Sequence, residues 1–251
     1  MKHLIQSLLL AVTIFSCKTV SAQKNKTTVT FPAKDKVTIT ADIYMTDNNN
    51  APFIILFHQA MFSRGEYLEI APELNKSGFN CMAVDQRSGL KVNGIANQTR
   101  KDAKSKGEST KYTDAFPDLE AALSYVKKEY SPKEIIVWGS SYSSSLVFIL
   151  AAKHPEISAV LSFSPGEYFK FENKSISDWA KDVKCPVFVT SSKKEAPDCS
   201  VIFKNAPNKK NIQFIPETSG FHGSKALWSS KPGHTEYWSA VSHFLNTFAT
   251  N

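Results

Sequence analysis

The sequence has little glycine or proline and few cysteines, and these shortages exclude several classes of protein. Ten glycines and 12 prolines in 251 residues are too few for a collagen-like or low-complexity chain, and four cysteines are too few for a disulfide-dense mini-protein. No apolar run of 18 or more residues occurs after the N-terminal segment, which argues against a protein that crosses a membrane several times. Because 42% of the residues are hydrophobic, we expect a globular chain with a substantial core.

The N-terminus has the pattern of an export signal. A short basic start precedes about a dozen mostly apolar residues, too few to span a membrane. Ordinary cleavage would follow Ala22, whereas a weak lipobox, IFSC, would leave a lipid anchor on Cys17. Because the bulky Phe15 fits a lipobox poorly, we expect a signal peptide over 1–22 and an exported mature domain over 23–251, either periplasmic or secreted.

An excess of Lys and Arg is the one compositional feature that suggests a nucleic-acid partner. The net charge of +7 falls to +5 on the expected mature chain, which keeps 28 basic against 23 acidic residues. The two candidate clusters are the run at 100–111, which also contains acids, and the Lys209-Lys210 pair. We therefore expect a solvated surface and no nucleic-acid partner.

Cysteine spacing leaves room for one disulfide in the mature chain. Cys81 lies inside an apolar run and is expected to be buried. Cys185 and Cys199 are 14 positions apart and would be free to pair in an oxidising compartment, a question that spacing leaves open. No C-x-x-C pair occurs and the six His are scattered, so neither a metal nor a cofactor is expected.

Strand patterns alternate with helical patterns along the mature chain. The segments 27–31 and 37–45 alternate apolar and polar residues, which predicts an antiparallel pair at a sheet edge. Continuous apolar runs, typical of strands covered on both faces, lie at 53–57, 79–84, 135–138, 160–163, 187–189 and 212–215. Helical spacing lies at 66–76, 115–130, 143–153, 177–184, 200–204 and 236–248. The pattern predicts one doubly wound α/β domain, with a mostly parallel central sheet and helices on both faces.

Two polar stretches without periodicity, 92–112 and 166–176, follow strands at the end of the sheet where ligands bind. The second is too short for a folded lid, so we expect little or no cap domain. Nearby apolar side chains would either line an acyl or aromatic pocket or, as the default, pack into the core: Met61, Phe62, Tyr168, Phe169 and Phe171.

The strongest chemical signal follows the strand at 135–138. There the sequence GSSYS leads from strand into helix, with small residues on both sides of Ser141. Such a corner holds its side chain above the sheet at a helix N-terminus, where developing negative charge is stabilised. Ser141 is therefore the candidate nucleophile. A corner at Ser143 is disfavoured because Gly139 directly follows the strand. The non-catalytic alternative is that these serines only cap the N-terminus of the helix.

Further polar residues occur in the order that serine chemistry on this architecture requires. The nucleophile needs a general base and the base needs an acid, each on a loop after a later strand. Glu195 and Asp198 both follow the strand at 187–189; the spacing favours Glu195 as the acid and leaves Asp198 to cap the next helix. His222, on the loop after the last strand, is the candidate base. His234 is expected to cap the last helix or face solvent, and His243 to pack.

The loop after the first buried strand completes the candidate site. Its sequence is HQAM, and the backbone N–H of Ala60, or of its neighbour Gln59, would hold an oxyanion together with the N–H of Tyr142. His58 is expected to have a structural role in this loop.

These motifs resemble those of an α/β-hydrolase of the small, dienelactone-hydrolase-like kind, from about Val37 to the C-terminus. The segment 78–89 (GFNCMAVDQRSG) resembles that family's fourth strand and its D-x-R-x-G turn, and the pair His222-Gly223 resembles its histidine loop. The resemblance implies Ser141, Glu195 and His222 as nucleophile, acid and base. Asp85 and Arg87 are expected to stabilise the turn.

The chain departs from the common pattern at three points: Ser143 and Gln59 stand where Gly is usual, and the acid is Glu rather than Asp. None removes a needed group. The implied reaction is hydrolysis of a small-molecule ester or lactone through an acyl-enzyme. Lys193 and Lys194 beside the acid, with the basic run at 100–111, would favour acidic substrates. A serine peptidase or acyltransferase, and an inactive binding protein with this fold, are the alternatives.

Overall fold

The strand β3 (Phe53–Phe57) shows how a continuous apolar segment becomes an inner strand. All five of its residues are buried, because successive side chains point to opposite faces of a sheet that is covered on both sides. Phe53, Ile55 and Phe57 pack into the core layer on one face. Ile54 and Leu56 pack into the layer on the other face.

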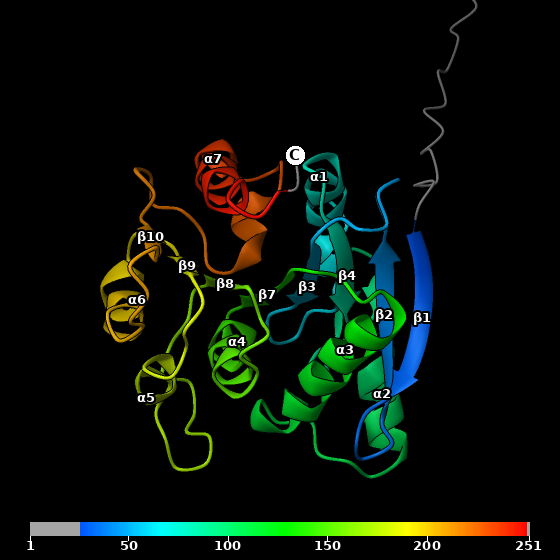
Figure 1. Cartoon of the computed structure of the whole chain (residues 1–251). Helices are drawn as coiled ribbons and strands as arrows, with labels where there is room; N and C mark the ends of the chain where they lie inside the picture. The colour runs from blue at the N-terminus through cyan, green and yellow to red at the C-terminus, as the bar shows by residue number, and fades with distance from the viewer. Residues whose placement is uncertain (1–25, 250–251) are drawn as a thin grey trace, which may run out of the picture.

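The computed structural model describes residues 26–249, in which β3 belongs to an eight-stranded sheet of order β1-β2-β4-β3-β7-β8-β9-β10 (Figure 1). The other strands are β1 (Lys26–Pro32), β2 (Thr38–Tyr44), β4 (Asn80–Val84), β7 (Ile135–Ser140), β8 (Ala159–Phe163), β9 (Val187–Thr190) and β10 (Ile212–Phe214). Strand β2 is antiparallel to β1 and β4, and the remaining neighbours pair in parallel. The predicted strands and the antiparallel edge pair are confirmed. The expected signal peptide and Cys17 lie outside the described residues.

Helices cover both faces of this sheet, with α1 and α7 on one side in Figure 1 and α3 to α6 on the other. The bounds are α1 (Ile70–Lys76), α3 (Phe116–Glu129), α4 (Tyr142–Lys153), α5 (Ile176–Ala180), α6 (Ala196–Phe203) and α7 (His234–Leu245). Short 3-10 turns are η1 (Arg64–Tyr67), η2 (Thr113–Ala115) and η3 (Ser224–Leu227). The predicted α/β architecture, with helices on both faces and little cap structure, is confirmed.

The stretch 92–112 is more ordered than its composition predicts. It contributes to a small hairpin, β5 (Lys91–Val92) with β6 (Ile95–Ala96), and contains α2 (Gln98–Ser105). The side chain of Asn97 caps α2 by accepting the N–H of Arg100 at 2.7 Å. Only two residues of this helix, Thr99 and Ala103, are buried, so it carries too few apolar positions to show helical periodicity.

The start of one helix differs from the prediction, and the structure answers the open question of the cysteine pair. Helix α6 begins at Ala196, earlier than predicted, so Asp198 lies inside its first turn and does not cap it. Cys81 is buried as expected, but Cys185 and Cys199 are both free thiols. The Sγ of Cys199 instead lies 3.2 Å from the carbonyl oxygen of Pro165.

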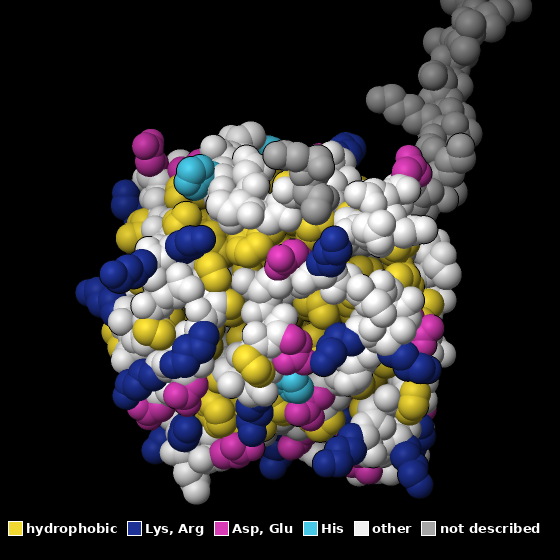
Figure 2. Space-filling view, viewed as in Figure 1, with side chains coloured by type: hydrophobic (Ala, Val, Ile, Leu, Met, Phe, Trp, Pro, Cys, Tyr) yellow, Lys and Arg dark blue, Asp and Glu magenta, His cyan; other side chains and the backbone are white. Residues whose placement is uncertain are grey.

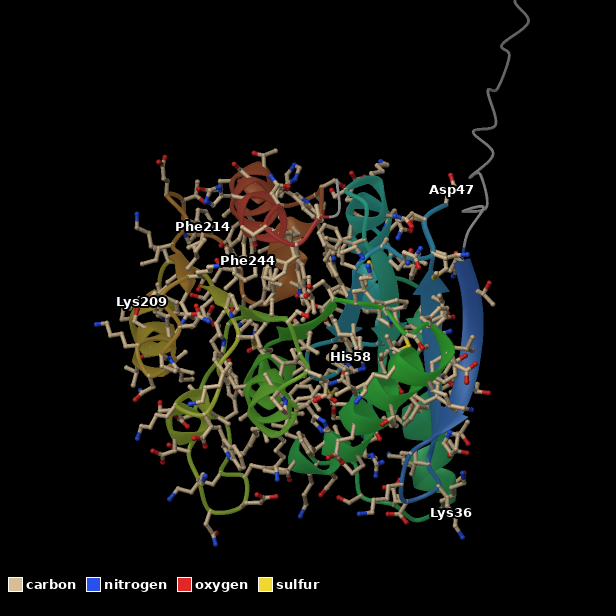
Figure 3. All side chains as sticks on the ribbon, viewed as in Figure 1. Lys36, Asp47, His58, Lys209, Phe214 and Phe244 are labelled. Carbon is tan, nitrogen blue, oxygen red and sulfur yellow. The ribbon has the colours of Figure 1, made fainter. Side chains whose placement is uncertain are left out.

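Charged side chains are mixed over the surface. Lys and Arg are interspersed with Asp and Glu on the face that Figure 2 shows, as expected for a solvated surface. Lys36 and Lys209 lie at the periphery of the molecule, whereas His58 lies in its interior (Figure 3). Among residues 26–249, no helix has the length and apolarity needed to cross a bilayer.

Candidate active site

A strained corner between β7 and α4 presents Ser141. Its backbone has φ 58° and ψ −125°, in the region that non-glycine residues rarely adopt. Gly139 permits this corner, because a Cβ at that position would lie 2.4 Å from the carbonyl oxygen of Ser143 in the first turn of α4. The residue at the corner is thus Ser141, and Ser143 is buried within the helix.

Ser141, His222 and Glu195 form a continuous hydrogen-bonded chain. The Nε2 atom of His222 lies 2.7 Å from Ser141 Oγ. Its Nδ1 atom lies 2.5 Å from Glu195 Oε1. The three residues come from the β7–α4 corner and from the segments after β10 and β9, which all meet at the carboxyl end of the parallel strands. Asp198, the other candidate acid, is exposed on α6 and does not contact His222.

The carboxylate of Glu195 is held in its ionised form. Its Oε2 atom accepts from Ser192 Oγ at 2.7 Å and from Ser164 Oγ at 3.1 Å. Burial by itself would raise the pKa of Glu195, but the hydrogen bonds from His222 and Ser192 outweigh it and lower the pKa to about 2. An ionised acceptor at this position favours the tautomer in which His222 carries its proton on Nδ1 and leaves Nε2 free to accept.

Ser164 joins the loops that carry the acid and the histidine, and sequence reasoning missed it. It follows β8 with φ 58°, a second strained serine close to the first. Its Oγ donates to Glu195 and accepts the N–H of Gly223, the residue after His222, at 3.0 Å. Its carbonyl oxygen accepts from the hydroxyl of Tyr168 at 2.9 Å. The one feature of the sequence that could have indicated this role is that Ser164 directly follows a strand, at the end of the sheet where ligands bind.

The structure corrects one of the candidate oxyanion donors. The N–H of Gln59 donates to Glu66 Oε2 at 2.8 Å and is therefore not available to a substrate. The N–H of Ala60 has no acceptor among the described residues. Tyr142 is the first residue of α4, so its N–H has no partner within the helix. Ala60 and Tyr142 remain as the candidate pair.

His58 is engaged in the loop that it begins. Its ring is buried; Nδ1 lies 2.8 Å from the carbonyl oxygen of Gln59, and Nε2 accepts the N–H of Gln86 at 2.9 Å. Burial lowers the pKa of His58 to about 4, so the ring is neutral at physiological pH. Of the other histidines, His234 is the first residue of α7, after Gly233 at the cap position. His243 lies in the last turn of α7, where it is exposed and does not pack as expected.

A cavity of about 500 Å³ lies beside Glu195, between the segment after β8 and α6. It is lined by Pro165, Gly166, Glu167, Tyr168, Glu195, Asp198, Cys199 and Val201. The apolar residues expected near the site divide into two groups. Tyr168 and Met61 are 42% and 56% exposed. Phe169 and Phe171 pack against the core, and Phe62 stacks on Trp228.

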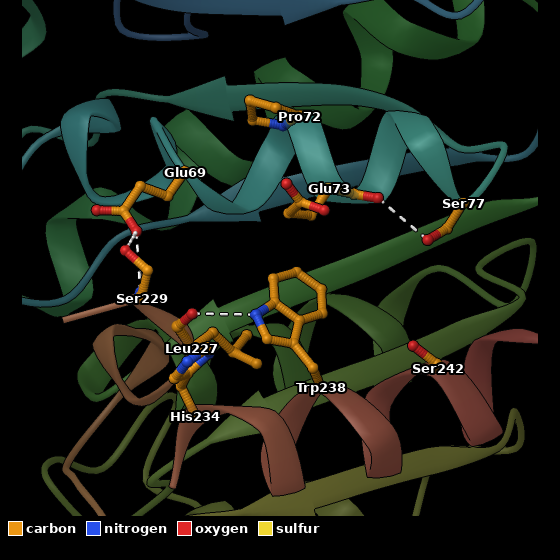
Figure 4. A pocket seen from close by; sticks show the side chains of 9 residues that line it. All are labelled: Glu69, Pro72, Glu73, Ser77, Leu227, Ser229, His234, Trp238 and Ser242. Carbon is orange, nitrogen blue, oxygen red and sulfur yellow. Dashed lines mark hydrogen bonds between the residues drawn. The ribbon is translucent and has the colours of Figure 1, made fainter. Parts of the chain in front are cut away.

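A second cavity, of about 560 Å³, lies between α1 and α7, and its lining does not include Ser141, His222 or Glu195 (Figure 4). Polar side chains at its rim bond within the protein: Trp238 Nε1 donates to the carbonyl oxygen of Leu227, and Ser229 Oγ donates to Glu69. Within residues 26–249, no three His, Cys, Asp or Glu side chains are grouped so as to hold a metal ion.

This geometry suits nucleophilic chemistry at a carbonyl carbon. A hydroxyl whose proton can pass to a neighbouring imidazole is an activated nucleophile, and an ionised carboxylate behind the imidazole stabilises the cation that forms. Two free N–H groups, one of them at a helix N-terminus, suit an oxygen atom that becomes negative during the reaction.

Comparisons with known proteins agree with this architecture. The family model described as serine aminopeptidase, S33, matches residues 48–213, more than half of the chain. No curated protein matches the chain in sequence. Among solved structures, the esterase Pf2001 of Pyrococcus furiosus superposes with a TM-score of 0.69 at 20% identity, over 89% of this chain and 93% of that one.

Two other solved structures are similar. A dienelactone hydrolase from Anabaena variabilis has a TM-score of 0.69 at 14% identity and covers 91% of this chain and all of its own. A thermostable carboxyl esterase from Bacillus coagulans has a TM-score of 0.67 at 12% identity, over 89% of this chain and 99% of that one. At these identities the likeness establishes a shared fold.

Proposed function

Since the chain belongs to the serine aminopeptidase S33 family and is thus a serine hydrolase with the α/β-hydrolase fold, we propose that it is a carboxylesterase acting on small-molecule esters. In this proposal Ser141 is the nucleophile, His222 the general base and Glu195 the acid that orients it. The observation that carries the proposal is the hydrogen-bonded chain from Ser141 Oγ through His222 to Glu195, with distances of 2.7 and 2.5 Å.

The reaction begins with attack of Ser141 Oγ on the ester carbonyl carbon. The hydroxyl proton passes to His222 Nε2, and the carbonyl oxygen becomes an oxyanion held by the N–H groups of Ala60 and Tyr142. When the C–O bond to the alcohol breaks, His222 returns the proton to the leaving oxygen. This leaves the acyl group esterified to Ser141.

A water molecule then completes the cycle. His222 Nε2 takes a proton from the water as its oxygen attacks the acyl carbon, and the same two N–H groups hold the second oxyanion. Collapse of this intermediate breaks the bond to Ser141 Oγ, which recovers its proton from His222, and releases the carboxylic acid. Glu195 stays ionised throughout and stabilises the imidazolium that forms in each half of the cycle.

The direct test is the Ser141→Ala variant, assayed with p-nitrophenyl acetate and butyrate. We expect kcat to fall about 10⁶-fold, to the residual rate that substrate binding and the oxyanion donors still give, while circular dichroism and the melting temperature show a folded protein. A fluorophosphonate probe should label the unsubstituted protein and fail to label the variant. Retention of ester turnover by the variant would overturn the assignment of Ser141, and absence of turnover and labelling in both would favour a binding protein without activity.

Peptide hydrolysis is a second candidate, which the description of the matching family favours. The same nucleophile, base and oxyanion donors serve amide and ester bonds, so the geometry around Ser141 does not separate the two reactions. Comparing kcat/KM on matched p-nitroanilide and p-nitrophenyl ester substrates with the same acyl group separates them. We expect turnover of the ester and little or none of the anilide.

We also propose that the enzyme is exported to the periplasm or secreted. The support is the N-terminal pattern of a basic start, an apolar stretch and the small residues before Gln23. Mass spectrometry of the protein recovered from its native host should give a mature chain that begins at Gln23. A lipid-modified N-terminal Cys17 would instead support a membrane anchor.

A further inference from the structure

A carboxylate lies buried beneath the candidate site and takes no part in the chain from Ser141 to Glu195. It belongs to Glu66, in η1 between β3 and α1, and the residue is 0% exposed. Its two oxygens face two different parts of the site. Oε2 accepts the N–H of Gln59 at 2.8 Å, and Oε1 accepts from the hydroxyl of Ser140 at 2.8 Å.

Both of these partners adjoin a candidate oxyanion donor. Gln59 directly precedes Ala60 on the loop after β3, and Ser140 precedes Ser141 and Tyr142 at the corner after β7. Because a peptide unit is planar, the anchored N–H fixes the unit that precedes Gln59, and only the two backbone dihedrals of Gln59 then set the direction of the Ala60 N–H. The anchored side chain of Ser140 likewise holds the residue from which the corner begins. One carboxylate therefore restrains the two segments that would hold an oxyanion.

The histidine loop is tied to the same point. Ser140 Oγ, while donating to Glu66, also accepts the N–H of Ser224 at 2.9 Å, two residues after His222. Ser224 Oγ in turn accepts from Trp138 Nε1 at 2.8 Å. The main chain of Glu66 is held as well, because its carbonyl oxygen accepts from Trp228 Nε1 at 2.9 Å. All of these contacts are internal to the protein, and Ser141 itself is half-buried.

A carboxylate is a costly way to join two loops. Burial disfavours the charged form and raises the pKa of Glu66 to about 7, although the hydrogen bonds from Gln59 and Ser140 and the charges of Lys225 and His222 oppose that shift. Apolar packing would join the loops with less desolvation, but without directional hydrogen bonds it would leave the orientation of the backbone N–H groups less defined.

We propose that Glu66 is a positioning residue for the oxyanion hole: it fixes the loop of Ala60 against the corner of Ser141 and Tyr142, so that both N–H groups point at one oxygen atom. This inference rests on the proposed function. Correct direction of such donors matters most in the transition state, where the oxygen carries its charge, and matters little for binding of the neutral substrate.

The test compares Glu66→Ala and Glu66→Gln with the unsubstituted enzyme at pH 8, using p-nitrophenyl butyrate. Alanine removes both acceptors, and we expect kcat to fall at least about tenfold with KM within about twofold. Glutamine keeps one oxygen acceptor, and we expect a smaller loss. The dissociation constant of a trifluoromethyl ketone, which forms a tetrahedral oxyanion on Ser141, should rise by the same factor as kcat/KM falls.

Asp118→Asn is the matched control. Asp118, on α3, is also a fully buried carboxylate with a pKa raised by burial, to about 6. It pairs with Arg87 in the turn after β4 and makes no hydrogen bond to residues 58–62 or 140–142. We expect this variant to melt at a lower temperature while kcat and the inhibitor constant stay within about twofold. An equal loss of kcat in Asp118→Asn would mean that lost stability alone explains the effect and would overturn the inference.

A readout that does not need turnover separates this inference from the proposed function. Hydrogen–deuterium exchange of a peptide covering 58–62 should accelerate in Glu66→Ala and stay unchanged in Asp118→Asn. Unchanged exchange, or an unchanged kcat and inhibitor constant in Glu66→Ala, would overturn the role of Glu66. If the unsubstituted protein shows neither turnover nor fluorophosphonate labelling, the proposed function is overturned. The role of Glu66 in catalysis is then overturned with it.

Discussion

Ser143 Oγ donates a hydrogen bond of 2.5 Å to the carbonyl oxygen of His58. Ser143 stands where the common nucleophile motif has Gly, and its hydroxyl also accepts from Gln86 Nε2 at 2.6 Å. The departure from the motif therefore joins three segments: the first turn of α4, the end of β3 and the turn after β4. The serine that replaces the usual glycine therefore makes two buried hydrogen bonds that hold these segments together.

Loss of this contact should destabilise the fold. We expect Ser143→Ala to lower the free energy of unfolding by about 1–3 kcal/mol, because Gln86 Nε2 and the carbonyl oxygen of His58 are left buried without this partner. Urea unfolding measures the change. The control is Ser105→Ala, which removes an exposed hydroxyl from the last turn of α2 and should change stability by less than about 0.5 kcal/mol. Equal effects in the two variants would contradict the role of Ser143.

The choice of acid can be tested with a pair of variants. Glu195→Gln keeps the shape of the side chain but removes the charge that stabilises the His222 imidazolium, and we expect kcat to fall about 10²- to 10⁴-fold. Asp198→Asn changes an exposed residue of α6 and should leave kcat within about twofold. Steady-state kinetics on one p-nitrophenyl ester decides between them. A large loss in the Asp198 variant with a small one in the Glu195 variant would reverse the assignment.

The free thiols predict insensitivity to reducing agents. A bridge between Cys185 and Cys199 would close a loop of about 15 residues and stabilise the protein by about 3 kcal/mol. Because both thiols are free in the structure, we expect the same melting temperature with and without dithiothreitol. Titration of the denatured mature protein with a thiol reagent should find three reactive groups; finding one would show that the pair forms.

The buried carboxylate of Glu66 predicts a pH-dependent stability. Its pKa in the folded protein is raised from 4.5 to about 7, so the folded state binds more protons than the unfolded state between these values. Stability contributed by this group is therefore present at low pH and is lost as the pH rises through about 7. The other titratable groups that interact with the Glu66 carboxyl group are Lys225, His222 and the phenol of Tyr67.

Comparison with Glu66→Gln isolates that contribution. A shift of this size corresponds to at most about 3 kcal/mol, so the unfolding free energy of the unsubstituted protein, relative to the variant, should fall by up to that amount between pH 5 and pH 8. Urea unfolding at the two pH values measures it. A constant difference between the two proteins would show that Glu66 ionises with an ordinary pKa.

Much of the fold follows from local pattern. Continuous apolar runs in inner strands such as β3 follow from burial on both faces, and that is written in successive residues. β2 alternates in sequence, yet six of its seven residues are buried, because a polar side chain such as Asp42 pairs with Arg64 inside the protein. The corner at Ser141 is local in the same way, because a small residue must stand where the strand meets the helix. Helix α2 escaped prediction because only two of its residues reach the core.

The chemistry around the corner was decided by contacts between distant segments. Glu195 and Asp198 are three residues apart, and only the start of α6 at Ala196 turns one toward His222 and leaves the other exposed on the helix. Likewise, nothing near Gln59 in the sequence indicates that its N–H is already used by Glu66.

The sequence by itself determined the order of strands and helices and the residue at the corner, because short-range sterics and burial periodicity act within a few residues. The spacing favoured Glu195 as the acid, and the tertiary structure brought it to the histidine. Tertiary structure alone decided which backbone N–H groups stay free and how Glu66, Ser140 and Ser224 join three loops. Hydrogen bonds depend on distance and direction in space, and the folded sheet sets both when it brings the ends of its parallel strands to one edge.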